Sequence, residues 1–294
     1  MRFSILALAT TLAATAHAAA SPAPAPATVA APAAASAMTL DQAKLLARQL
    51  LGGDAAALVQ LKQAADQGEP QAAYVLGLLY TAGKGVEQDP KQALAYFTKA
   101  ADKGDADAQF WLGQAYLKGE GAPKDANQAI AWLQKSAAQG NMHAQFSLGT
   151  LYSVGDSVPR DWKQAFYWLE KAADQGDAAA ANNLGRLYMM GEGAPLSYSK
   201  AAEWYQKAAQ DGDGVAAINL CGIYQAGKGI SRDYALALQW CFIGDSLTQS
   251  GDKARFDGQR YETFLLQKLP QDEIAKAKAD ASAWLQQNKS KQQP

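Results

Sequence analysis

This sequence of 294 residues contains few of the side chains that bind metals or act as nucleophiles. The only histidines are His17 and His143, and the only cysteines are Cys221 and Cys241. Metal centres and nucleophile–base pairs generally need more imidazole and thiolate groups than these. We therefore interpret His143 as a surface residue, and we expect no metal site and no cofactor.

Glycine pairs and carboxylates are abundant, but their positions indicate structural roles. The pair Gly83 and Gly85 does not extend to the glycine pattern that binds a dinucleotide, and similar pairs recur along the chain. Most carboxylates stand where helices are expected to begin or end, so no pair suggests a general acid and base. A serine hydrolase would need a serine beside a base, and we find none. The sequence therefore predicts no catalytic residues and no enzyme.

The charge balance argues against a further class of partner. The chain carries 27 basic and 28 acidic residues, a net charge of −1, and no basic block stands out. Nucleic acid and anionic membrane surfaces would be poor electrostatic partners for such a chain. Because no apolar run is long enough to span a bilayer, we expect no transmembrane anchor.

The elements that must position these residues repeat with a period of 36. Leucine, tyrosine, glycine and alanine each recur five times at this step, as in Leu76, Leu112, Leu148, Leu184 and Leu220, and in Tyr80, Tyr116, Tyr152, Tyr188 and Tyr224. A fixed period of this size indicates a solenoid of similar supersecondary units rather than a domain with one central pocket.

The pattern within each repeat predicts two antiparallel helices joined by a glycine turn. The fourth repeat spans residues 178–213, and its Leu184, Leu187 and Tyr188 fall on one face of a helix. Residues 191–195 are rich in glycine and end that helix. Helix-capping residues then recur at the start of the second helix, and glycines at its end. The caps are Asp89, Asp125, Asp161, Ser197 and Asp233, and the glycines are Gly68, Gly104, Gly140, Gly176 and Gly212. The expected fold is an all-α, right-handed α/α solenoid of five 36-residue helix–turn–helix repeats, with a helical cap at each end.

This pattern resembles the Sel1-like repeat, a relative of the tetratricopeptide repeat. The first unit carries the resemblance in the Ala-x-x-x-Leu-Gly-x-x-Tyr run of residues 72–80, the glycine turn of residues 83–86, the capping Asp89 and the Lys-Ala-Ala of residues 99–101. The likeness extends from about residue 71 to 245, with small departures at Ser157 and Cys221. It implies an exported bacterial member whose repeats bind another protein.

The two ends predict export and capping segments. Residues 1–18 read as a signal peptide cut after Ala18, because a single basic residue precedes a short apolar core and small residues. Residues 19–38 read as an Ala/Pro-rich disordered linker. The remaining segments are an N-terminal helical cap at 39–69, repeats at 70–248, a C-terminal cap at 249–290 with helices at 252–268 and 271–287, and a disordered tail at 291–294. The expected location is periplasmic or secreted.

The resemblance implies that the first helix of each repeat lines a concave face. The candidate partner-binding residues are then Tyr74, Leu78, Phe110, Gln114, Phe146, Asn182, Arg186 and Met189, and the fifth unit places Ile218 and Gly222 at the equivalent positions. Aromatic, Arg and Met side chains suit a peptide or protein ligand. The aromatic residues could equally pack helix on helix, and this alternative stays open.

The resemblance also brings the two cysteines together. In a hairpin of this kind Cys221 and Cys241 face each other, and export would place them in an oxidising compartment. Either they form a disulfide that holds the last repeat, or their Cα atoms lie beyond the bridging limit of about 7 Å and they pack as small apolar side chains.

The leading functional hypothesis is an exported, non-enzymatic scaffold or adaptor that binds a protein or peptide of the cell envelope along its concave face. One alternative is an immunity or inhibitor protein that masks a toxin. Another is a binder of peptidoglycan or polysaccharide, which would favour exposed tryptophans. Against it, four tryptophans recur at what we read as a repeat-core position, namely Trp132, Trp168, Trp204 and Trp240. The sequence leaves the oligomeric state open and favours a monomer.

Overall fold

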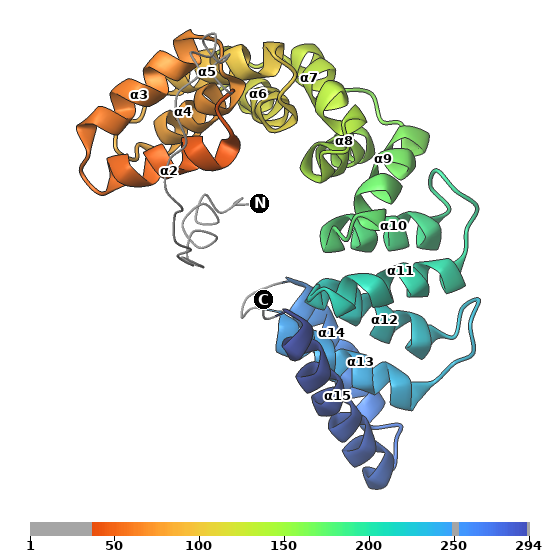
Figure 1. Ribbon diagram of the computed structural model, residues 1–294. Helices are drawn as coiled ribbons and strands as arrows, with labels where there is room; N and C mark the ends of the chain where they lie inside the picture. Colours follow the sequence, from red (N-terminus) through yellow and green to blue (C-terminus); the bar gives the residue numbers. More distant parts are fainter. Residues whose placement is uncertain (1–36, 249–252, 293–294) are drawn as a thin grey trace, which may run out of the picture. The chain divides into compact units, whose positions relative to one another are not determined.

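The computed structural model describes residues 37–248 and 253–292, and the regular elements in these ranges are all helices (Figure 1). The predicted signal peptide and nearly all of the predicted linker lie outside the described residues. No described helix has the length and apolar character needed to cross a membrane.

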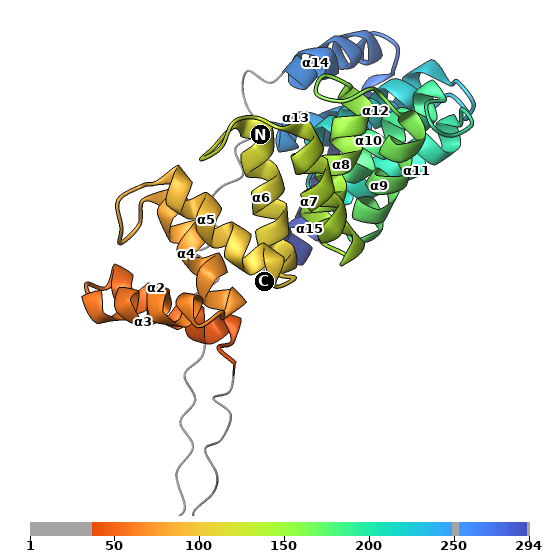
Figure 2. The ribbon, with the colours of Figure 1, turned by 90° about the horizontal axis from the view of Figure 1, so that it is seen from above.

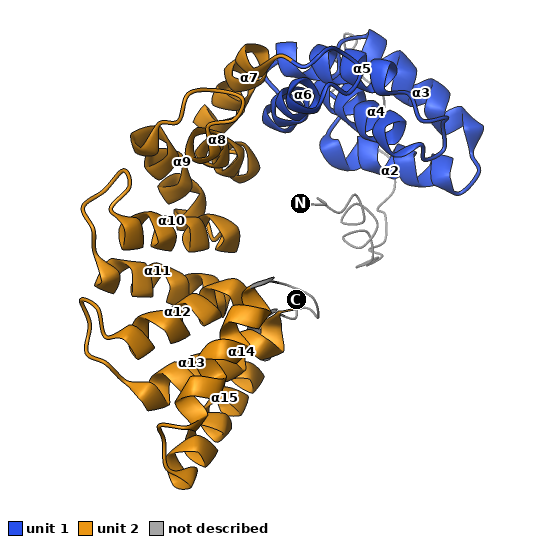
Figure 3. Cartoon of the chain, turned by 180° about the vertical axis from the view of Figure 1, so that it is seen from behind, with its two compact units in different colours: residues 1–124 blue, residues 125–294 orange. Residues whose placement is uncertain are grey.

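The chain divides into two compact units, residues 1–124 and residues 125–294 (Figure 3). Unit 1 contains α2 (Leu40–Leu51), α3 (Ala55–Asp66), α4 (Pro70–Ala82), α5 (Pro90–Asp102) and α6 (Ala106–Lys118). Unit 2 contains α7 (Ala126–Ala138), α8 (Met142–Val154), α9 (Trp162–Asp174), α10 (Ala178–Met190), α11 (Tyr198–Gln210), α12 (Gly214–Ala226), α13 (Tyr234–Leu247), α14 (Lys253–Leu266) and α15 (Gln271–Gln292).

Successive helices pair as antiparallel hairpins, as the period predicts. Within the units the hairpins are α4 with α5, α8 with α9, α10 with α11 and α12 with α13. Neighbouring hairpins of unit 2 are then joined by contacts of α9 with α10 and of α11 with α12. Within each unit, neighbouring hairpins therefore share apolar faces, which is how a solenoid builds its core.

The predicted caps start the second helices. The carboxylate of Asp161, for example, accepts hydrogen bonds from the backbone N–H groups of Lys163 and Gln164, at 2.9 and 3.0 Å. Asp89 and Asp125 cap their helices in the same manner, whereas Asp233 accepts one such bond, from the N–H of Leu236. Ser197 accepts a single, longer bond of 3.3 Å from the N–H of Lys200. These side chains satisfy amide groups that lack partners at a helix start.

The repeat leucines and small residues form the core. Leu76, Leu112, Leu148, Leu184 and Leu220 are at most 1% exposed. Gly185 of α10 faces Tyr205 of α11 so closely that a Cβ atom at Gly185 would lie 2.8 Å from the tyrosine ring. The small residue therefore sets the spacing of the two helices, as the sequence indicates.

A disulfide joins the two helices of the fifth repeat. Cys221 of α12 and Cys241 of α13 are bonded, and their Cα atoms are 5.3 Å apart. Cys221 stands where the other repeats have the small glycine, and both side chains are buried.

The caps differ in detail from the prediction. The N-terminal segment predicted as a cap, residues 39–69, contains the two helices α2 and α3, which begin after Thr39 and Asp54. At the other end α15 continues to Gln292 and includes residues expected in the tail. No proline or glycine interrupts the chain between residues 287 and 292, so nothing in the sequence stops the helix there.

Candidate partner-binding surface

We call the side of the first helices that carries the predicted residues the first-helix face, and we describe it unit by unit. In unit 1, α4 supplies Tyr74 and Leu78, and α6 supplies Phe110 and Gln114. Phe110 is only 6% exposed, whereas the other three are half-buried. The face of unit 1 is therefore more aliphatic and polar than the predicted aromatic stripe.

The aromatic side chains of unit 1 pack against one another. Phe97 of α5 stacks on Trp111 of α6 with ring centroids 5.9 Å apart, and Phe110 meets Trp111 edge to face at 5.6 Å. Tyr74 lies 6.3 Å from Phe97. Burial raises the pKa of the Tyr74 phenol, and the Asp107 carboxylate acts in the same direction. The aromatic residues on this face thus serve packing, which was the alternative left open by the sequence.

In unit 2 the predicted residues come from α8 and α10. Phe146 is 4% exposed and belongs to the core, whereas Asn182, Arg186 and Met189 are half-buried. The side-chain oxygen of Asn182 accepts a hydrogen bond from the amide of Asn219 on α12, at 3.1 Å. Asn182 therefore also ties α10 to α12.

Arg186 has loose partners. Its Nη1 atom lies 3.8 Å from Oε2 of Glu192, in the turn after α10, and 3.7 Å from the sulfur of Met190. The Arg186 side chain remains 40% exposed.

Helix α14 lies in the segment predicted as the C-terminal cap, and it covers the first-helix face of the fifth repeat. It packs on α12 and α13, and Figures 1 and 2 both show it beside them. Gly258 lies against Ile218, and a Cβ atom at Gly222 would lie 3.3 Å from the Tyr261 hydroxyl. The open part of the first-helix face in unit 2 is thus provided by α8 and α10.

The recurring tryptophans are not all core residues. Trp132, Trp168 and Trp204 are half-buried, and lysine ammonium groups lie 3.7 Å from the ring centre of Trp132 and 3.8 Å from that of Trp204. Only Trp240 is buried as expected, at 5% exposure, because Trp284 of α15 meets it edge to face at 5.5 Å. The other three are not fully buried: Trp204 packs against the core of unit 2 with part of its side chain, and all three border solvent.

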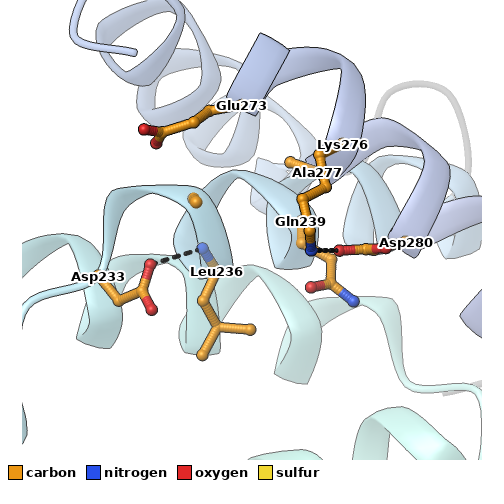
Figure 4. Close-up of a pocket in the computed structure, with 8 residues that line it drawn as sticks. Asp233, Leu236, Gln239, Glu273, Lys276, Ala277 and Asp280 are labelled. Carbon is orange, nitrogen blue, oxygen red and sulfur yellow. Dashed lines mark hydrogen bonds and ion pairs between the residues drawn. The ribbon is translucent and has the colours of Figure 1, made fainter. Parts of the chain in front are cut away.

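A hollow of about 400 Å³ lies between α13 and α15 (Figure 4). Its charged groups are largely engaged, since Lys276 pairs with Asp280 at 2.6 Å and Asp233 caps α13 through the N–H of Leu236. His143 is exposed on α8. Within the described residues no group of three or more His, Cys, Asp or Glu side chains is arranged to hold a metal ion.

Solved structures of other proteins share this fold, and two of them are more than 25% identical to this chain in sequence. A Sel1 repeat protein from Oxalobacter formigenes is 29% identical with a TM-score of 0.65, over 76% of this chain and 99% of that chain. The second is c5321, which displays an SLR fold and is a protective antigen present in uropathogenic Escherichia coli strains. It is 26% identical to this chain with a TM-score of 0.52. That match covers 84% of this chain and 61% of the other, so this chain spans less than two thirds of that protein.

An immunity protein from Pseudomonas aeruginosa is also similar, at 24% identity and a TM-score of 0.43 over 70% of this chain and 81% of that one. No curated protein matches the sequence.

The family model for the Sel1 repeat matches residues 70–105, 106–141, 143–177, 178–213 and 214–241, which together exceed half of the chain. Its phase agrees with the helix hairpins described above. This chain belongs to the Sel1 repeat family.

Proposed function

We propose that this protein is an exported, non-enzymatic scaffold that binds a protein or peptide partner of the cell envelope along its first-helix faces. Sel1 repeat proteins are typically protein-interaction scaffolds. The observation that carries the proposal is a set of half-buried side chains at equivalent positions of successive first helices. Leu78 and Gln114 represent it in unit 1, and Arg186 represents it in unit 2.

The disulfide supports the proposed location. Disulfides persist in oxidising compartments and are rare in the cytosol. The bond between Cys221 and Cys241 is therefore consistent with a periplasmic or secreted protein. The signal peptide expected at residues 1–18 belongs to the same proposal.

Site-specific photo-crosslinking tests the proposed surface. The full chain would carry a photoreactive amino acid at Leu78 or at Met189, on the first-helix faces, and be irradiated with envelope extract of its host. A matched control carries it at Tyr167 of α9, which is 46% exposed on a second helix. We expect one partner protein to be captured from both face positions and not from the control. Capture from Tyr167 alone, or from none of the three, would overturn the proposal.

A narrower form of the proposal is an immunity protein, for which the captured partner would be a toxin. Its test is growth of cells that produce the toxin, with and without this protein.

The half-buried tryptophans favour a second candidate, binding of an envelope polysaccharide. These side chains, on α7, α9 and α11, are partly exposed and could stack on sugars, although lysines cover two of them. Retention on isolated peptidoglycan that is lost on Trp168→Ala would support this reading over the scaffold.

A further inference from the structure

We propose that Arg186 is the specificity-determining residue of the first-helix face in unit 2, and that it receives the carboxylate of an Asp or Glu side chain within a peptide segment of the partner. This inference rests on the proposed function and gives the partner a chemical character.

Arg186 is the only strongly charged residue on the three first helices of unit 2. Helices α8, α10 and α12 contain no Asp, Glu or Lys and no other Arg. A partner that is complementary to this face therefore carries a negative charge opposite Arg186 and uncharged groups elsewhere.

The donors of Arg186 are poorly used within the protein. A guanidinium has five N–H donors, and carboxylates are its best partners. The distance of 3.8 Å to Glu192 is longer than a charge-assisted hydrogen bond, and the Met190 sulfur is a weak acceptor. The guanidinium can therefore bind an additional carboxylate without breaking a strong contact.

Two buried hydroxyl groups of unit 2 also lack hydrogen-bond partners. Thr150 of α8 stands at the place in its repeat that Arg186 has in the next repeat. Its Oγ1 atom is buried and has no hydrogen-bond partner. The hydroxyl of Tyr205 on α11 is likewise unpaired, in a side chain that is 0% exposed. Burial raises the pKa of Tyr205, and the charge of Arg186 acts in the opposite direction.

Unpaired buried hydroxyls are rare because each has lost its water partners without replacement. The hydroxyl of Thr150, in a half-buried side chain of α8, could donate to a polar group of a bound segment, directly or through one water. Glu192 Oε2 is buried, forms no hydrogen bond and lies 3.8 Å from Nη1 of Arg186, so it competes for the guanidinium.

The surroundings favour a peptide side chain over a free anion. Met189 is half-buried and Met190 is 53% exposed, so apolar and adaptable surface adjoins Arg186. The uncharged face continues on both sides of Arg186 along α10, from Asn182 to Met189. A segment with an internal acidic residue can use this surface on both sides, whereas a chain terminus can use only one.

Selection from a library of short random peptides, displayed with a blocked C-terminus, tests the inference. The baits are the full wild-type chain, Arg186→Gln and Lys163→Gln, which removes one exposed positive charge from α9 and serves as the matched control. We expect the wild-type and Lys163→Gln baits to enrich peptides with an acidic residue at one position, and the Arg186→Gln bait to lose that preference.

Fluorescence anisotropy on the best peptide then measures the pairing. Replacing its acidic residue by the corresponding amide should weaken binding about tenfold on the wild type and about twofold or less on Arg186→Gln. Glu192→Gln should strengthen binding several-fold, because it removes the competing carboxylate. Circular dichroism on each variant confirms that the helices are retained.

The outcomes separate the inference from the proposed function. An acidic preference that persists with Arg186→Gln, the absence of any acidic preference, or binding that needs a free C-terminal carboxylate would overturn the role of Arg186 while leaving peptide binding intact. Enrichment of no peptide by any bait would overturn the inference together with the proposed scaffold.

Discussion

Replacing Gly193 by alanine should destabilise unit 2 more than the same change at another left-handed glycine. Gly193 lies in the turn between α10 and α11 with φ +79°. An added Cβ atom would overlap the carbonyl group of Trp162 at the start of α9, and it would lie 3.0 Å from the Cβ of Phe166. The substitution therefore combines an unfavourable backbone conformation with a collision against the preceding repeat.

The two penalties can be sized separately. A left-handed backbone costs a non-glycine residue about 1–2 kcal/mol, and forcing atoms into a packed contact costs about 1–3 kcal/mol more. The free energy of unfolding should fall by about 2–5 kcal/mol in Gly193→Ala. Gly140 is the matched control, since it has φ +89° and nothing within 4 Å of its added Cβ. Gly140→Ala should show the backbone penalty alone.

Urea denaturation followed by circular dichroism measures both variants against the wild type. The informative quantity is the difference between the two losses, because the backbone penalty is common to both. If Gly193→Ala is no less stable than Gly140→Ala, the contact with α9 is not rigid and the reasoning fails. Ser157 replaces the equivalent glycine in the third repeat, so the result concerns the local contact rather than the position in general.

Three further predictions follow from the contacts described. Reduction of Cys221–Cys241, whose partners are 20 residues apart, should lower the free energy of unfolding by about 3 kcal/mol; the melting temperature with and without reductant checks this, and a double alanine variant should not respond to reductant. Ser197→Asp should stabilise the protein by about 0.5–1 kcal/mol, because an aspartate cap such as Asp161 accepts two hydrogen bonds and places a negative charge at a helix start; an unchanged urea midpoint would contradict it. Burial raises the pKa of Glu262 above its ordinary value of 4.5, so the folded state binds this proton more tightly than the unfolded state. The free energy of unfolding should therefore rise as the pH falls from neutrality toward 4.5. Glu262→Gln should remove that rise and be more stable than the wild type at neutral pH, whereas an identical pH dependence of the two proteins would refute the assignment.

The helix caps and the glycines that follow the second helices were predicted correctly from the sequence. The caps Asp89, Asp125, Asp161 and Asp233 are visible because a helix start needs an acceptor, and the glycines after the second helices adopt the expected positive φ. The period then fixed which helices pair, since each repeat buries the same face.

The exposure of particular side chains could not be read in the same way. Phe110 and Phe146 occupy the register of the first-helix face but are buried, and the repeat pattern does not show which side chains cover a given position. Trp132 and Trp240 share one position of the repeat, yet only Trp240 is buried, because α15 lies over it. Helix α14 falls outside the period, so its place on α12 had no signal in the repeat pattern.

The pairing of Trp240 with Trp284 has an evolutionary consequence. A duplication after α13 would insert a new hairpin where α15 now lies, leaving Trp284 without its partner. A duplication of one whole period earlier in unit 2, such as the hairpin of α10 and α11, would leave that junction intact. The length of such a chain in related lineages is therefore expected to change by internal gain or loss of 36-residue blocks, with the terminal helices inherited together with the disulfide-linked hairpin.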